Sequence, residues 1–114
     1  MSFKEKHKLY QRKKESKRIL NKYPDRIPVV AELSEKSTLP KLSKTKYLVP
    51  NELTMGEFKF VIRKRIQIDS ELSLFMFVNN TLPTQIATMK ELYEQHHDVD
   101  GFLYITVSEE NTFG

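Results

Sequence analysis

The run KYLVPNELTMGEFKFVIRKR, residues 46–65, carries the strongest structural signal in this chain. Its first five residues, ending at Pro50, predict a short strand closed by a proline. Thr54 and Glu57 then have the spacing of a capping box. The apolar residues that follow fall on one helical face: Phe58, Val61, Ile62 and Ile66. The run therefore predicts a strand followed by a helix.

Three flanking segments predict further strands: residues 26–33, 72–78 and 102–107. Pro28 lies within the first of them, and because proline lacks an N–H, we expect an edge strand or a bulge there. The second ends at Asn79-Asn80. Helical spacing returns at Met89, Leu92, Tyr93 and His96. This order predicts an α+β fold in which a helix packs on one face of the sheet.

The first 24 residues predict two short helices, from apolar residues at helical spacing: Phe3, His7 and Tyr10, then Ile19, Leu20 and Tyr23 before Pro24. Residues 1–24 hold nine Lys/Arg and two Glu, a net charge of +7, whereas the rest of the chain has a net charge of −3. Such a segment attracts anionic lipid, nucleic acid or an acidic protein surface such as tubulin, and a solvated helix face explains it equally well. Nucleic acid is not an expected partner, because no recognised binding motif accompanies the charge.

Composition excludes several classes of protein. A chain of 114 residues with 39% hydrophobic content predicts one domain, and the absence of cysteine excludes disulfides and thiolate sites. The N-terminal sequence lacks the apolar run of a signal peptide, and no segment has the apolar length of a transmembrane helix. We therefore expect a cytoplasmic protein whose contact with membranes depends on a surface or an added lipid.

No catalytic, cofactor or metal site is predicted. His96 and His97 are adjacent, so on a helix they point about 100° apart and make a poor metal pair. The run Asp98 to Gly101 resembles the start of a calcium loop but lacks its later ligands, so a turn is expected. No phosphate loop or nucleophile arrangement occurs. An enzyme is the weakest interpretation.

Several runs together resemble one known family: RIPV at 26–29, KYLVP at 46–50, FMFVN at 75–79, DGFLY at 100–104 and ENTFG at 110–114. They match, in order and from Phe3 to Gly114, the autophagy modifiers that include the GABA-A-receptor-associated protein and the microtubule-associated light chains. The resemblance implies a ubiquitin-like β-grasp with two additional N-terminal helices. It implies a helical extension at 1–24, the β-grasp domain at 25–107 and a conjugation tail at 108–114, in a monomer.

The resemblance further implies that Gly114 is joined to phosphatidylethanolamine. E1-like activating and E2-like conjugating enzymes would perform the coupling, and a cysteine protease would process or release the protein. Glycine suits this role because it has no Cβ to hinder attack on its carbonyl. Whether residues beyond Gly114 must first be removed stays open. The expected locations are the cytoplasm, the autophagosome membrane and the vacuole or lysosome.

The second implied site is a groove for cargo receptors and other partners that carry aromatic-x-x-aliphatic motifs, bound along an exposed strand edge at Lys46 to Pro50. The family pattern assigns the aromatic pocket to Glu15, Ile19, Pro28, Val30, Lys46, Leu48 and Phe102. It assigns the aliphatic pocket to Tyr47, Val49, Pro50, Leu53, Phe58, Val61 and Arg65. Acidic residues flanking the motif would meet Arg26, Lys44, Lys46 and Arg65. A second docking surface is implied near Phe75 and Phe77, although strand phenylalanines are more often core, as Phe58 and Val61 could be.

Overall fold

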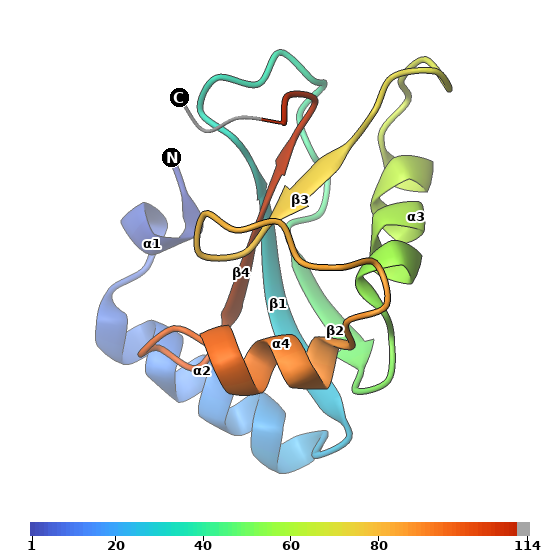
Figure 1. The fold of residues 1–114 in the computed structure, drawn as a ribbon. Helices are drawn as coiled ribbons and strands as arrows, with labels where there is room; N and C mark the ends of the chain where they lie inside the picture. Colours follow the sequence, from blue (N-terminus) through green and yellow to red (C-terminus); the bar gives the residue numbers. More distant parts are fainter. Residues whose placement is uncertain (112–114) are drawn as a thin grey trace.

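A four-stranded mixed sheet organises the chain, and the computed structural model describes residues 1–111 (Figure 1). The strands are β1 (Arg26–Leu33), β2 (Lys46–Pro50), β3 (Phe75–Phe77) and β4 (Leu103–Ser108), in the order β2-β1-β4-β3. β1 is parallel to β4, whereas the outer pairs are antiparallel. The helices are α1 (Phe3–Lys6), α2 (Leu9–Lys22), α3 (Met55–Arg65) and α4 (Met89–His96).

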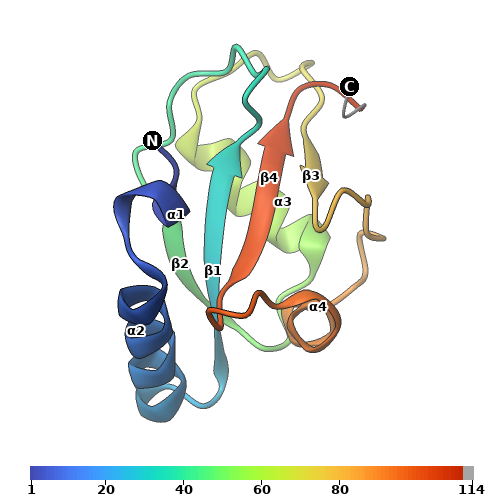
Figure 2. The same ribbon diagram turned by 90° about the vertical axis from the view of Figure 1, so that its left-hand side faces the viewer.

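Helices cover both faces of the sheet. Figure 2 shows α3 behind the sheet and α1 and α2 on the side nearer the viewer. Alternate residues of β1 therefore enter two cores: Val29 and Ala31 belong to the large core with α3, and Val30 joins Phe3, Ile19 and Phe102 beneath α1 and α2. This two-sided burial explains why five consecutive residues of β1 are buried.

The capping boxes define the helix starts. Thr54 Oγ1 accepts a hydrogen bond from the Glu57 N–H at 3.2 Å, and Glu57 Oε1 accepts from the Thr54 N–H at 2.9 Å, as the sequence predicted. Thr88 and Glu91 form the same arrangement at α4. These hydrogen bonds satisfy N–H groups that have no partner within the first helical turn.

Three sequence predictions need correction. β1 is a central strand, although Pro28 predicted an edge or a bulge. Pro28 precedes the ladder with β4, which begins at Val29, and the hydrogen bond from the Ala31 N–H to the Thr45 carbonyl places residues 27, 29 and 31 at the bonding positions toward β2. The missing N–H of Pro28 therefore costs the sheet no hydrogen bond.

The N-terminal helices also divide differently. α1 ends at Lys6, and α2 begins at Leu9, because the Lys8 N–H donates to Gln11 Oε1 at 2.9 Å and starts a new helix there. Tyr10, predicted on an apolar stripe, is 65% exposed. The strand predicted over 72–78 is shorter: β3 covers three residues and ends before a turn in which Asn79 and Asn80 both have positive φ.

Candidate functional site

The open edge of β2 is the first part of the candidate site. β2 lies at the end of the sheet, with β1 as its neighbour. Since residues 45, 47 and 49 bond toward β1, the backbone amides of Lys46 and Leu48 point away from the sheet. The Leu48 carbonyl accepts a hydrogen bond from Arg26 Nη1 at 3.3 Å. This edge can accept an added strand once the arginine moves aside.

A hollow of about 400 Å³ lies between α2 and β2 and is lined by Glu15, Arg18, Ile19, Tyr23, Lys44, Lys46, Tyr47, Leu48 and Phe102. Five residues assigned to the aromatic pocket line it: Glu15, Ile19, Lys46, Leu48 and Phe102. Pro28 and Val30 are buried, and Val30 is fully enclosed, so neither meets a ligand directly in this conformation. Arg18 and Tyr23 were missed, although Tyr23 follows Ile19 by one helical turn.

An ion pair joins the two elements that flank this hollow. The Lys46 ammonium from β2 pairs with the Glu15 carboxylate from α2, and the two side chains are 47% and 24% exposed. The same ammonium lies 5.9 Å from the centre of the Phe3 ring. Exposed pairs of this kind contribute about 0–1 kcal/mol. Breaking this pair to admit a ligand therefore costs little free energy.

The α3 face of β2 carries the residues assigned to the aliphatic pocket. Tyr47 and Val49 are buried in the large core, where the Tyr47 ring meets Phe58 edge-on at 5.4 Å. Burial raises the pKa of Tyr47, an effect that Arg65 partly offsets. Pro50, Val61 and Arg65 are exposed and Leu53 is half-buried, whereas Phe58 is completely buried. Phe58 thus packs against Tyr47 in the core, as its apolar helical face favoured, and does not line the pocket surface as the resemblance implied.

The cations assigned to acidic flanks surround the β2 edge. Arg26, Lys44, Lys46 and Arg65 are all exposed. Lys44 lies 4.9 Å from the centre of the Tyr47 ring, and the Arg65 guanidinium lies 5.8 Å from it. Their positions give this edge a positive potential. The second surface expected near Phe75 and Phe77 is less accessible, because Phe75 is half-buried and Phe77 is 5% exposed.

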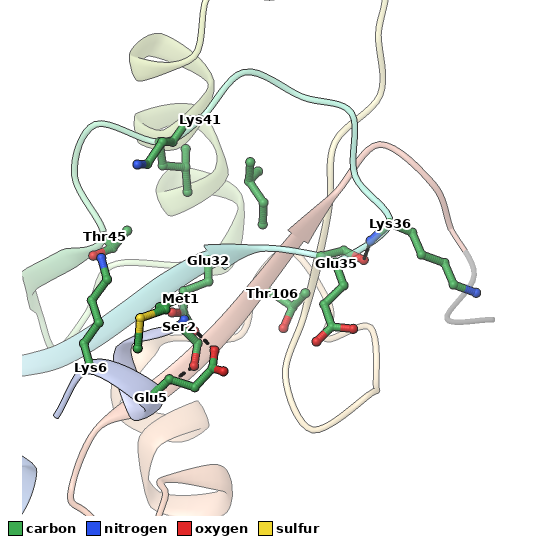
Figure 3. A pocket seen from close by; sticks show the side chains of 13 residues that line it. Met1, Ser2, Glu5, Lys6, Glu32, Glu35, Lys36, Lys41, Thr45 and Thr106 are labelled. Carbon is green, nitrogen blue, oxygen red and sulfur yellow. Dashed lines mark hydrogen bonds between the residues drawn. The ribbon is translucent and has the colours of Figure 1, made fainter. Parts of the chain in front are cut away.

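A larger hollow of about 830 Å³ lies beside α1, against the end of β1 and the loop before β2 (Figure 3). The Glu5 carboxylate in its lining accepts a hydrogen bond from the Ser2 N–H at 2.8 Å, and Glu32 Oε2 accepts from the Phe3 N–H at 2.7 Å. Three lysines balance three glutamates around it: Lys6, Lys36 and Lys41 against Glu5, Glu32 and Glu35. The lining therefore favours neither an anion nor a cation.

Gly114, the expected conjugation site, lies outside the described residues. The chain leading toward it is held at Glu109, whose Oε2 accepts hydrogen bonds from the backbone N–H and the hydroxyl of Thr38, both at 2.8 Å. The backbone hydrogen bond from Thr38 is the main cause that lowers the pKa of Glu109 to about 2. Glu109 thus ties the end of β4 to the loop between β1 and β2.

The segment Asp98 to Gly101 forms a turn, as predicted. The Gly101 N–H donates to the Asp98 carbonyl at 2.9 Å, and both carboxylates pair with N-terminal cations: Lys4 with Asp98 and Arg12 with Asp100, each at 2.7 Å. Burial tends to raise the pKa of Asp98, but the hydrogen bond from Lys4 and the other polar contacts lower it overall. Within residues 1–111, no group of three or more His, Asp or Glu side chains could hold a metal ion.

Comparison with known proteins agrees with this geometry. A family model described as "Autophagy protein Atg8 ubiquitin like" matches residues 11–114. Autophagy-related protein 8c of Arabidopsis thaliana is 54% identical over 113 residues, which cover 99% of this chain and 95% of the relative. Autophagy-related protein 8 of Vanderwaltozyma polyspora is 53% identical, with coverage of 99% and 96%.

Solved structures give the same result. Trypanosoma brucei ATG8 superposes with a TM-score of 0.90 at 37% identity and covers 100% of this chain and 98% of its own. Plasmodium falciparum Atg8, solved in complex with a Plasmodium falciparum Atg3 peptide, has a TM-score of 0.91 at 37% identity and 99% coverage of both chains. The fold is therefore the ubiquitin-like α+β fold that the sequence predicted, and the chain belongs to the Atg8 family of ubiquitin-like autophagy proteins.

Proposed function

We propose that this protein is a membrane-anchored docking module, conjugated through Gly114 to phosphatidylethanolamine, that recruits partners with aromatic-x-x-aliphatic motifs to the autophagosome. The observation that carries the proposal is the open edge of β2, which has the 400 Å³ hollow on its α2 face, exposed Pro50 at its end and exposed Val61 on α3. Homologues in the family are ubiquitin-like modifiers.

The geometry of a strand explains why the motif has two spacers. Side chains alternate between faces, so residues i and i+3 of an added strand point to opposite sides of the sheet. Leu48 and Lys46 lie on the α2 side of β2, and Tyr47 and Val49 on the α3 side. An aromatic residue at position i fits the hollow, and an aliphatic residue at i+3 then reaches the surface around Pro50, Leu53 and Val61.

The expected affinity is moderate. Burying an aromatic ring of roughly 150–250 Å² at about 25 cal/mol per Å² yields several kcal/mol, part of which is lost when the peptide becomes ordered. A net free energy of binding of about −8 kcal/mol corresponds to a micromolar Kd. Arg26, Lys44, Lys46 and Arg65 add preference for acidic flanking residues, which weakens as salt rises.

Other proteins would perform the conjugation. An E1-like enzyme would adenylate the Gly114 carboxylate with ATP, releasing pyrophosphate, and its cysteine thiolate would then displace AMP to form a thioester. After transfer to a cysteine of an E2-like enzyme, the lipid amine would attack the thioester carbonyl, and the amide forms as the thiol leaves. The Plasmodium relative is solved with an Atg3 peptide, which supports a conjugating enzyme as a partner of this chain. Within residues 1–111, no helix is both long and apolar enough to cross a membrane. The two acyl chains of the lipid would provide the anchor.

The basic face of α2 offers a second contact with the membrane or with an acidic surface such as tubulin. Lys13, Lys14, Lys17 and Arg18 are exposed, whereas Ser16 and Ile19 of the same helix are buried. Deleting α2 would also remove residues that line the hollow. The electrostatic contact is therefore best tested by changing Lys13, Lys14 and Lys17 together to glutamine. Each charge contributes about 1 kcal/mol to binding of anionic vesicles.

Mass spectrometry of the protein recovered from its own cells tests the proposed function directly. A phosphatidylethanolamine adduct on Gly114 is the expected result. For the docking role, amide shifts of the protein titrated with an aromatic-x-x-leucine peptide should change along residues 46–50. An unmodified C-terminus under autophagy-inducing conditions contradicts the conjugation proposal, and shifts confined to other elements contradict the docking site.

A further inference from the structure

The turn before β4 touches α2 at a point where no side chain fits. Gly101 has a φ of +90°, and a Cβ placed on it would come within 2.9 Å of the Ser16 Cβ on α2 and overlap the Ser16 hydroxyl. Carbon atoms in ordinary contact are about 3.5–4.0 Å apart. The turn at residue 101 therefore lies so close to Ser16 of α2 that only glycine fits there without moving one of the two segments.

Buried polar groups hold this contact in place. The Ser16 hydroxyl donates to the Asp100 carbonyl at 2.6 Å, and Arg12 Nη1 pairs with Asp100 Oδ2 at 2.7 Å. Tyr104 donates its hydroxyl to the same carboxylate. The Asp100 residue is 1% exposed and the Arg12 side chain 11% exposed. Separating a buried charge pair leaves an uncompensated charge, so α2 is held firmly against the turn.

Two neighbours of these residues, Ile19 and Phe102, line the aromatic hollow. The Phe102 N–H donates to Asp100 Oδ1 at 2.8 Å, which holds the backbone of this lining residue in place. Ile19, which lines the wall, lies one helical turn after Ser16, and both are buried on the same face of α2. Moving α2 away from Gly101 would therefore move Ile19 away from Phe102 and Leu48.

We propose that the contact between Ser16 and Gly101, held by Arg12, Asp100 and Tyr104, is a spacer that sets the size of the aromatic pocket and thereby selects which ring it accepts. The inference rests on the proposed peptide-binding function. A wider pocket favours the indole of tryptophan over the smaller phenyl ring of phenylalanine, because more of the larger ring becomes buried.

Gly101→Ala is the direct test. Restoring ordinary contact with the Ser16 Cβ requires α2 and the turn to separate by about 0.6 Å, and by more if the Ser16 hydroxyl does not rotate away. Calorimetry with two peptides that differ only in Trp or Phe at the aromatic position should show the ratio of Kd values shifting roughly three- to ten-fold in favour of Trp. A crystal structure of the variant without peptide should show the larger distance between Ile19 and Leu48.

The control separates spacing from backbone strain. Gly101→Ala combined with Ser16→Gly keeps alanine at the positive φ but removes both Ser16 atoms that it would meet, so the ratio should return toward the native value. Ser16→Gly alone shows the effect of losing the serine. Ser16→Thr enlarges the contact from the helix side without straining residue 101, and it should shift the ratio in the same direction if Gly101→Ala fails to fold.

The outcomes distinguish the spacer from the docking function. An unchanged ratio in folded Gly101→Ala, or an α2 that has not moved, overturns the spacer. A double variant that keeps the shifted ratio does the same, because strain at residue 101 then explains the effect. Failure of the wild-type protein to bind either peptide refutes the docking function instead, and the unliganded structures still report whether α2 moved.

Discussion

Replacing Leu48 by alanine should weaken peptide binding about two- to five-fold while leaving the fold intact. Leu48 is 37% exposed in the free protein, and a ring seated in the hollow would cover that remaining surface. Fully burying a leucine side chain is worth about 1.5–3 kcal/mol, so covering roughly a third of it contributes about 0.5–1 kcal/mol. At about 1.4 kcal/mol per factor of ten, the upper value corresponds to a five-fold rise in Kd.

Calorimetry with an aromatic-x-x-leucine peptide measures the change. Leu82→Ala is the matched control, because Leu82 is 47% exposed but follows β3, at the opposite edge of the sheet. Thermal unfolding should show both variants folded. Wild-type affinity in Leu48→Ala, or equal losses in the two variants, would refute binding at the β2 edge.

Three further perturbations address the ion pair, the tail and the loop. Lys46→Ala should weaken binding of an acid-flanked peptide more than binding of a neutral one. Glu15→Gln should strengthen binding of the acid-flanked peptide, because it frees the Lys46 ammonium. Calorimetry at two salt concentrations checks both variants, and changes in affinity of the same sign contradict a competing Lys46–Glu15 ion pair. Deletion of Gly114 should block lipid coupling in a reconstituted reaction, with Asn111→Ala as the control, and normal coupling of the deleted chain would rule out Gly114 as the site. The Thr38 amide shift should titrate with a midpoint of about 2, because the pKa of Glu109 is lowered from 4.5. The stabilisation from Glu109 is then fully present above about pH 4.5 and lost as pH falls toward 2, and a midpoint near 4.5 would contradict the hydrogen bonds.

The sequence predicted features that depend on neighbouring residues better than features set by distant ones. The capping box at Thr54 and Glu57 is local, and both of its hydrogen bonds are present. The position of Pro28 was predicted wrongly because local chemistry shows only that an N–H is missing. Whether that N–H is needed depends on where the ladder with β4 begins, more than 70 residues later in the chain.

The same distinction holds for the candidate site. Leu48 and Lys46 were assigned through the resemblance of their own strand, and they line the hollow. The apolar helical face on which Phe58 lies already favoured core, and its complete burial agrees with that interpretation rather than with the pocket role implied by the resemblance. The approach of Ser16 to Gly101 joins two segments with no pattern in common, so no sequence signal pointed to it.

The pairing of β1 with β4 also determines when this molecule can fold. β1 is the first strand to leave the ribosome, and β4, its parallel neighbour, is the last. Until residues 103–108 emerge, β1 lacks one of its two neighbouring strands. The apolar side chains of both cores then remain accessible to solvent. Contacts of such long sequence separation slow folding, and unpaired strand edges promote aggregation. Newly made chains should therefore need protection by chaperones until residues 103–108 have emerged, and truncation within β4 should yield insoluble protein rather than a smaller folded domain.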